Sequence, residues 1–474
     1  MMRQVVILVM VAMLVVSCGR VVVPEGAEVR SVGLYPDYRD VVVPREIAPL
    51  NMMIVEDGVE GVCAVYEAGD RRMCVGSREG KYVIDEGEWR ELLGDSAVGR
   101  VRVSVYYSMG EVCCRDTFSI GVSDDAFDKY VTYRLIEPGY EVWHALQIEE
   151  RDMTSFRTRI LADNSRLNGQ CMNCHIHGGD GVSLFHLRGK GGATMLCRGG
   201  ALRKVTLKND SMVSGAVYGD IDRTGRYGVF STNVIIPALH SVGSKRLEVY
   251  DTESDLCMAD FETGRMILSD KVMGNETLET FPCFGADGRT VYYCSAGMRA
   301  LPDSIWELKY SILRIGFDGE KWGDRVDTVW SAARNGGSAS FPKVSPDGKY
   351  LMFACSECGT FPIWHRETDL RMIDLETGEE VDVSELNSPV SETYHTWSSS
   401  GRWVVFASKR GDGQYGRVYV AHVDNEGRAS RPFVIPQEDP ESDILCLKSY
   451  NIPDVGYERA GFSSGDVERL FWGE

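Results

Sequence analysis

A strand–turn–strand pattern of apolar and polar positions recurs four times in the C-terminal half of the chain. Each copy carries a glycine at its turn (Gly225, Gly288, Gly348 and Gly401), with spacings of 63, 60 and 53 residues. A tight turn between two strands needs a residue at positive φ, which glycine adopts without strain. The copies are Ile221–Thr232, Phe284–Ser295, Val344–Cys355 and Trp397–Ser408.

Further short apolar runs follow each copy, so that one unit holds about four strands. They are Arg246–Tyr250, Ser311–Ile315, Leu370–Asp374 and Arg417–His422. Four strands at a period of this length are typical of one blade of a β-propeller. Three more strand-like runs, at 183–188, 193–197 and 204–207, add a fifth blade, and a sixth is possible. We therefore expect a propeller of about five to six blades over residues 181–474.

The N-terminal part predicts a separate β domain over residues 41–145. Its β-branched and aromatic runs are separated by Gly and Asp turns, and one helical turn is expected at Glu86–Leu93. The expected strands are 51–55, 61–66, 82–84, 100–107 and 117–122. Short alternating strands of this kind favour a sandwich-like domain. We see no acid/base pair or nucleophile motif in it, and we interpret it as a spacer or docking module.

Between the two lies a segment, 146–180, that we predict to be a short helical haem-binding segment. Met153, Phe156, Ile160 and Leu161 fall at i, i+3, i+7 and i+8, which favours a helix from Glu149 to about Asn164. Such a stripe most often faces a protein core. The fold class expected for the chain is thus all-β, with this one helical segment between a sandwich-like domain and a propeller.

The sequence Cys171-Met-Asn-Cys174-His175 matches the Cys-x-x-Cys-His signature of covalently attached c-type haem. The two thiols add to the two vinyl groups of one porphyrin, and the histidine becomes an axial ligand of the iron. We therefore predict haem c held by Cys171, Cys174 and His175. A zinc site, a disulfide or a chance match are the alternatives.

The sequence does not assign the sixth ligand of the iron. His186 is our first candidate and Met195 the second, with a distant residue or an open position as the alternative; His177 is too close to His175 to reach the opposite face. A closed six-coordinate haem favours electron transfer, whereas an open position permits ligand binding or peroxide chemistry.

The N-terminus predicts export and lipid attachment. One arginine, an apolar run from Val5 to Val16 and Ser17-Cys18 are typical of a lipoprotein signal, with residues 1–17 removed and Cys18 lipidated. The apolar run is shorter than the roughly 20 residues that a membrane-spanning helix needs. Residues 18–40 then form a tether. Export agrees with the haem motif, because c-type haem is attached outside the bacterial inner membrane, and we expect the chain on the periplasmic face or in the outer membrane.

Charge and the other motifs narrow the function further. With 51 basic and 70 acidic residues the net charge is −19, which argues against nucleic acid as a partner. Eleven cysteines remain beside Cys18 and the haem pair; Cys63/Cys74 and Cys113/Cys114 are disulfide candidates, and Cys355/Cys358 is a local disulfide or two unlinked thiols. The hydrolase pattern Gly461-Phe-Ser-Ser-Gly465 has no histidine after it, so a hydrolase is excluded.

The chain resembles the TolB-like family of periplasmic β-propellers. Ser345-Pro-Asp-Gly-Lys349 carries that family's blade signature in full. The whole layout is similar to Bacteroidetes lipoproteins called cytochrome c biosynthesis or TolB-like proteins. The residues that carry this similarity are 47–51, 133–140, 171–175 and 185–188. The resemblance implies the architecture and haem attachment, and no particular reaction.

Two functions follow as hypotheses. In the first, the chain is an envelope lipoprotein that carries one covalent haem on a propeller and exchanges electrons with a protein partner. In the second, it is a TolB-like binding scaffold in which the haem is structural, sensory or absent. Neither is a conventional enzyme, and no catalytic residue is assigned.

Overall fold

A computed structural model describes residues 23–95, 97–137, 145–178, 181–189, 192–242 and 245–473. Its contacts divide the chain into two compact units. The first contains the described residues up to Asp40, Pro49–Val122 and Pro436–Glu441; the second contains Val41–Ala48, Ser123–Ile435 and the residues from Ser442 onward. None of the helices in these ranges is long and apolar enough to cross a membrane.

The first unit is built from two sheets and one helix. Residues 18–40 are not only a tether, because β1 and β2 lie among them and Leu34 and Tyr38 are buried in the unit. The larger sheet has the order β1-β9-β8-β5-β6 and the smaller one β2-β4-β7. The strands are β1 (Glu28–Val29), β2 (Leu34–Tyr35), β4 (Met52–Ile54), β5 (Val59–Ala68), β6 (Arg71–Gly76), β7 (Lys81–Tyr82), β8 (Arg100–Met109) and β9 (Val112–Ser123).

Helix α2 (Glu86–Leu93) confirms the helical turn expected at these residues. The Asp85 carboxylate accepts hydrogen bonds from the amides of Gly87 and Glu88 and so caps the helix, while Trp89 and Leu92 are buried. The segment Pro436–Glu441 joins this unit from far along the chain. There Lys81 Nζ lies 2.9 Å from Asp439 and 2.8 Å from Glu441.

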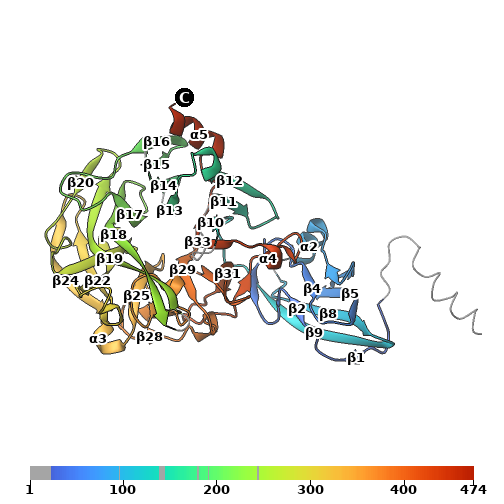
Figure 1. Ribbon diagram of the computed structural model, residues 1–474. Coiled ribbons are helices and arrows are strands. Elements are labelled where there is room, and N and C mark those ends of the chain that lie inside the picture. Colours follow the sequence, from blue (N-terminus) through green and yellow to red (C-terminus); the bar gives the residue numbers. More distant parts are fainter. Residues whose placement is uncertain are drawn as a thin grey trace, which may run out of the picture. The chain divides into compact units, whose positions relative to one another are not determined.

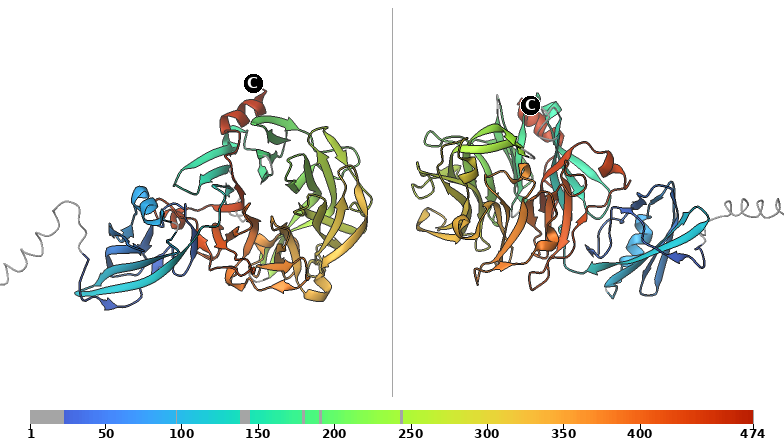
Figure 2. Two further views of the ribbon diagram at one scale, coloured as in Figure 1. Left: turned by 180° about the vertical axis from the view of Figure 1, so that it is seen from behind. Right: turned by 60° about the horizontal axis from the view of Figure 1, so that its bottom comes forward.

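The second unit is a β-propeller of six four-stranded antiparallel sheets arranged around an axis (Figures 1 and 2). The sheets have the orders β33-β10-β11-β12, β13–β16, β17–β20, β21–β24, β25–β28 and β29–β32. The structure thus places six blades where the sequence indicated five or six. The strands of the unit are β3 (Val42–Pro44), β10 (Tyr130–Ile136), β11 (Leu146–Asp152), β12 (Thr158–Asp163), β13 (Met172–His177), β14 (Ser183–Leu187), β15 (Ala193–Arg198), β16 (Ala201–Val205), β17 (Ala216–Ile221), β18 (Tyr227–Val242), β19 (Lys245–Asp260), β20 (Arg265–Ile267), β21 (Thr277–Phe284), β22 (Thr290–Gly297), β23 (Ser311–Phe317), β24 (Trp322–Trp330), β25 (Ser338–Val344), β26 (Tyr350–Ser356), β27 (Asp369–Asp374), β28 (Glu380–Val381), β29 (Glu392–Trp397), β30 (Trp403–Ser408), β31 (Arg417–His422), β32 (Phe433–Val434) and β33 (Ser449–Gly456).

The ring closes through a strand from the end of the chain. β33 pairs antiparallel with β10, with Tyr130 opposite Gly456 and Ile136 opposite Ser449. One blade therefore combines three strands from the start of the unit with one from its end. β10 thus belongs to the propeller, although the sequence placed residues up to 145 in the N-terminal domain.

The helix predicted from Glu149 to about Asn164 is wrong. These residues lie in β11 and β12 and end in a short 3-10 turn, η1 (Asn164–Arg166), and the haem motif that follows lies on a strand, not a helix. The apolar spacing that suggested a helical stripe has another cause: Met153 and Leu161 are buried in the propeller, whereas Ile160 is exposed. The other short elements are η3 (Ile305–Glu307), α3 (Ala332–Asn335), η4 (Pro362–Trp364), η5 (Ser384–Leu386), α4 (Ser442–Leu445) and α5 (Ser464–Trp472).

Buried apolar side chains fill the spaces between neighbouring blades. Phe230, for example, packs between the β13–β16 and β17–β20 sheets. Tyr293 packs between the β17–β20 and β21–β24 sheets, and Phe353 packs between the β21–β24 and β25–β28 sheets. The four turn glycines have φ between 63° and 78°, as the sequence analysis requires. Burial of both faces of a sheet against its two neighbours explains why the strands read as nearly continuous apolar runs.

The thirteen described cysteines are free thiols. Cys63 and Cys74 lie next to each other on β5 and β6 and interact through their side chains, without a bond between them. Ser463, from the excluded hydrolase pattern, caps α5: its hydroxyl accepts a hydrogen bond from the amide of Asp466.

Candidate functional site

The innermost strand of each blade contains a bulge that turns side chains toward the propeller axis. The pairing register shifts within each of β13, β17, β21, β25 and β29. A bulge inserts an extra residue into a strand and re-aims its side chains. Five bulges hold a non-glycine residue in the left-handed region: Cys174 (φ 52°), Phe281 (49°), Phe341 (53°), Tyr394 (50°) and Ile452 (53°).

Backbone strain of this kind costs energy and clusters at functional sites. In the sixth inner strand, β17, the register shift lies between Ala216 and Gly219, so the bulge is Val217-Tyr218 and Gly219 follows it. A Cβ at Gly219 would collide with the carbonyl oxygen of Val229 and the ring of Phe230, so only glycine fits there.

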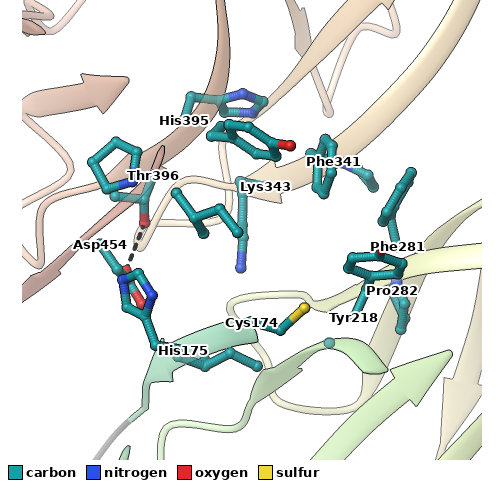
Figure 3. A pocket seen from close by; sticks show the side chains of 16 residues that line it. Cys174, His175, Tyr218, Phe281, Pro282, Phe341, Lys343, His395, Thr396 and Asp454 are labelled. Carbon is teal, nitrogen blue, oxygen red and sulfur yellow. Dashed lines mark hydrogen bonds between the residues drawn. The ribbon is translucent and has the colours of Figure 1, made fainter. Parts of the chain in front are cut away.

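The bulges line one cavity on the axis, which we call the channel cavity; its volume is about 70 Å³. Figure 3 shows Cys174, Tyr218, Phe281 and Phe341 around it. The rings of Phe281 and Phe341 pack with centroids 3.9 Å apart, and those of Phe341 and Tyr394 5.0 Å apart. The lining residues are Cys174–Ile176, Tyr218, Gly219, Phe281, Pro282, Phe341–Lys343, Tyr394–Thr396 and Ile452–Asp454.

Charged groups form a second layer of the channel. Lys343 Nζ lies 3.0 Å from Asp220 Oδ1. Asp454 accepts hydrogen bonds from Thr396 Oγ1 at 3.3 Å, drawn as the dashed line in Figure 3, and from the His177 amide at 2.8 Å. Burial disfavours the charge of Lys343, but Asp220 and Asp454 outweigh it and raise the pKa of its ammonium group. Lys343 is therefore charged at neutral pH.

His175 is the polar group of the channel cavity that lacks a partner. It is 5% exposed, and neither ring nitrogen has a hydrogen-bond partner among the described residues. Burial lowers the pKa of its ring to about 3, with smaller contributions from His177 and Arg134. The nearby carbonyls of Thr132 and Ile452 only partly oppose this. A buried imidazole that is neutral and unpartnered has a free lone pair, which is what a metal ion or a hydrogen-bond donor needs.

Of the predicted haem residues, the structure brings Cys174 and His175 to one cavity. Burial raises the pKa of the Cys174 thiol to about 11, so it is protonated at neutral pH. Cys171 is partly buried against the apolar cluster around Phe185 and does not line the channel cavity. Cys18 lies outside the described residues.

The two candidate sixth ligands lie elsewhere. Met195 is fully buried in the apolar cluster between the first two blades, and His186 lines a different cavity from His175. Cys355 and Cys358 also lie apart from the axis: Arg371 Nη1 approaches Cys355 Sγ at 3.7 Å, and both cysteines line a surface depression.

The residues fit a covalent haem only in part. His175 suits an iron ligand, and Cys174 lies beside it. However, pockets that hold cofactors measure roughly 300–1,000 Å³, whereas the channel cavity measures about 70 Å³. The channel cavity by itself is therefore too small for the macrocycle, and a covalent haem would have to extend beyond it. No group of three or more His, Cys, Asp or Glu side chains in the described part of the chain is arranged to bind a bare metal ion.

A second cavity adjoins the first and opens toward the turn end of the inner strands; we call it the mouth. It measures about 520 Å³ and shares Thr396 and Asp454 with the channel cavity. Its lining mixes apolar and polar residues and carries charges of both signs, including Arg223 and Glu458. The exposed ring of Tyr457 lies at its edge.

The sequence analysis did not identify most residues that line the channel cavity, although their spacing to the turn glycines marks them. Tyr218, Phe281, Phe341 and Tyr394 each lie seven residues before a turn glycine, and so does Cys174, before Gly181. Cys174 thus occupies the position that holds an aromatic residue in four other blades. His395 also lines the channel cavity, with Nε2 2.9 Å from the Met352 carbonyl.

Comparison with known proteins finds similar solved structures and no matching sequence. No family model and no curated protein sequence matches the chain. Among solved structures, TolB from Acinetobacter baumannii is similar at 12% identity and a TM-score of 0.44, over 78% of this chain and 85% of that one. A hypothetical selenium-binding protein from Sulfolobus tokodaii is similar at 11% identity and a TM-score of 0.42, over 72% and 96%.

The β-propeller domain of the Trilobed protease from Pyrococcus furiosus is similar at 8% identity and a TM-score of 0.36, over 62% of this chain and 80% of that one. The six four-stranded sheets of its own structure show that the described chain forms a β-propeller.

Proposed function

We propose that this protein is a lipid-anchored binding scaffold of the bacterial cell envelope and that its mouth and channel cavity form the binding site. The observation that carries the proposal is the pair of adjoining cavities on the propeller axis, joined at Thr396 and Asp454. A concave site of several hundred Å³ with a few placed polar groups is the usual form of a binding site.

The two cavities offer different chemistry to a bound group. The mouth provides charges of both signs, so it suits a polar segment of a protein partner. The channel cavity beyond it is lined mainly by aromatic rings and proline, with Lys343 and Asp454 at its edge. A partner segment whose tip is a small apolar side chain would bury that tip in the channel cavity and keep its polar groups in the mouth.

Cross-linking from the mouth tests this proposal. Tyr457, which is 77% exposed at the edge of the mouth, is replaced by p-benzoylphenylalanine in the full-length lipoprotein in its own membranes. We expect a light-dependent adduct of defined mass. Illumination that gives no adduct from this position would overturn the proposal.

We propose covalent haem attachment as a second candidate function, favoured by the unpartnered, neutral His175 beside Cys174. Cys171 and Cys174 would form the thioether bonds and His175 would bind the iron. When bound, haem would supply one-electron redox chemistry, and the protein would then be an electron carrier. Burial lowers the pKa of His175 to about 3, so a neutral ring would be able to offer a lone pair to the iron.

An absorption spectrum decides the second candidate. The chain is produced together with the c-haem attachment machinery and denatured, and the covalently retained haem is measured. Attachment predicts a haem spectrum that the double variant Cys171→Ala/Cys174→Ala loses. The matched control, Cys355→Ala/Cys358→Ala, removes the other Cys-x-x-Cys pair and should keep the spectrum. Wild-type protein without retained haem rules the candidate out and leaves the binding scaffold unaffected.

A further inference from the structure

A third cavity lies between the second and third blades and shares no lining residue with the channel cavity or the mouth. We call it the His186 pocket; its volume is about 360 Å³. His186 and Thr194 reach it from β14 and β15, Arg188 from the turn between them, and Asn233 from β18. The loop between β16 and β17 supplies Lys208 and completes the wall.

The charge of this pocket is opposite to that of the chain. Arg188 and Lys208 are its charged lining residues, and no aspartate or glutamate is among the described residues that line it. The side chain of Arg188 makes no hydrogen bond or ion pair within the described part of the chain, and its Nη2 is buried. In a protein with 70 acidic and 51 basic residues, an arginine without a carboxylate partner inside a cavity is available for a ligand.

His186 adds a second, buried donor. Its side chain is 5% exposed, Nδ1 lies 2.8 Å from Thr194 Oγ1, and Nε2 has no hydrogen-bond partner among the described residues. Burial, together with the charge of Arg188, lowers the pKa of the ring to about 4, although the nearby Val217 carbonyl opposes the shift, so the ring is neutral at pH 7. When the Thr194 hydroxyl donates to Nδ1, the proton of the ring lies on Nε2 and can be donated to an acceptor.

We propose that the His186 pocket binds a small organic anion through a phosphate or carboxylate group. The Arg188 guanidinium would pair with the anion, Nε2–H of His186 would donate a hydrogen bond to it, and Lys208 would add charge at the rim. A planar guanidinium binds either group through two parallel hydrogen bonds. The volume exceeds that of a bare phosphate or acetate ion and lies at the lower end for small-molecule sites, so a compact ligand with a few carbon atoms fits.

The proposal is independent of the function assigned to the axis. The His186 pocket and the two axial cavities have separate linings, so failure of either proposal leaves the other standing. Arg188 relates it to the haem motif in two ways: its amide donates to the Cys171 carbonyl at 2.9 Å, and its charge acts on the thiols of Cys171 and Cys174. The side chain of Arg188 remains free for the pocket.

Isothermal titration calorimetry of the full-length protein tests the proposal, with glucose 6-phosphate as one probe and succinate as the other. Sodium chloride at equal ionic strength corrects for non-specific screening. Heat from the phosphate alone identifies a phosphate site, heat from succinate alone a carboxylate site, and heat from both a general anion site. Absence of saturable heat with either probe overturns the proposal.

Three variants place the binding in the pocket. Arg188→Gln should weaken the affinity at least about tenfold, because it removes the charge-assisted pair. Lys208→Gln, an exposed change that leaves the fold intact, should weaken it by a factor of about two to five. Arg289→Gln, on an exposed turn of another blade, is the matched control and should leave it unchanged. An affinity that survives both Arg188→Gln and Lys208→Gln contradicts the assignment.

Discussion

His365 carries a buried positive charge between two carboxylates. Its side chain is fully buried, with Nε2 3.0 Å from Glu248 Oε2 and Nδ1 3.1 Å from Glu367 Oε1. Glu248 lies in β19, in the third blade, whereas His365 and Glu367 lie between β26 and β27, in the fifth. The contact therefore ties two blades that are not neighbours. Burial opposes the charged ring, but the two carboxylates outweigh it and raise the pKa of His365 to about 9.

The size and sign of the effect follow from this pKa. A rise from 6.5 to about 9 corresponds to about 3 kcal/mol of stability, since one pKa unit is worth about 1.4 kcal/mol. The folded state holds the proton more tightly than the unfolded state. The contribution is therefore fully present below the unfolded pKa of 6.5 and disappears as the pH rises through 9.

Urea unfolding of wild type and His365→Gln measures the effect. Tryptophan fluorescence reports mainly on the propeller, because eight of the nine tryptophans lie beyond residue 122. We expect the difference in unfolding free energy between the two proteins to be about 3 kcal/mol larger at about pH 6 than at about pH 10. Arg325→Gln, with a side chain 85% exposed, is a control without pH dependence in this range. A His365→Gln loss that is equal at both pH values would refute the buried charge.

Further predictions concern other parts of the chain. Asp251 is fully buried and burial raises its pKa to about 7, so Asp251→Asn should gain up to about 4 kcal/mol relative to wild type between pH 4 and pH 8 in the same unfolding assay; an equal difference at both pH values contradicts this. Trp403→Ala, at a fully buried ring whose indole donates to the Asp125 carbonyl, should cost about 3–5 kcal/mol, and a loss below about 1 kcal/mol would contradict the packing. A stop codon after Lys448 removes β33 and should abolish cooperative unfolding of the propeller; a retained sharp transition in calorimetry would show that the ring does not need this strand. Cys18→Ser should move the protein from the membrane to the soluble fraction, and unchanged membrane sedimentation would rule out the lipid anchor.

Local turn chemistry made much of the propeller predictable. Gly225, Gly288, Gly348 and Gly401 mark tight turns that only a residue at positive φ allows, and the strands on both sides follow directly. Helix α2 was equally predictable, because Asp85 caps its N-terminus from the adjacent position in the sequence. Interactions between residues close in sequence therefore carried the correct part of the prediction.

The closing blade could not be predicted in the same way. β33 pairs with β10 across more than 300 residues, and no local pattern in Ser449–Gly456 indicates its partner. The wrong helix has a related cause. β11 and β12 bury apolar residues on the faces that neighbouring blades cover, and the resulting irregular spacing happens to match a helical stripe over Met153–Leu161.

The spacing of Cys171, Cys174 and His175 predicted a haem site, and the structure shows where these residues lie. Cys174 and His175 lie on the bulge of an inner strand and line the channel cavity, while Cys171 lies outside that cavity. The aromatic residues of the site recur seven positions before each turn glycine, and this regular spacing is the sequence signal for them. Lys343, Asp220 and Asp454 meet only in the folded ring, because they come from three different inner strands.

Cross-linking from the mouth, compared with an exposed aromatic position elsewhere, tests the axial binding site most directly. The photoreactive residue is placed at Tyr457, at the edge of the mouth, or at Trp472, which is 56% exposed on α5 and lines none of the described cavities. Binding at the axis predicts a discrete adduct from position 457 that is absent from position 472. Equal yields from both positions, or an adduct from position 472 alone, would contradict it.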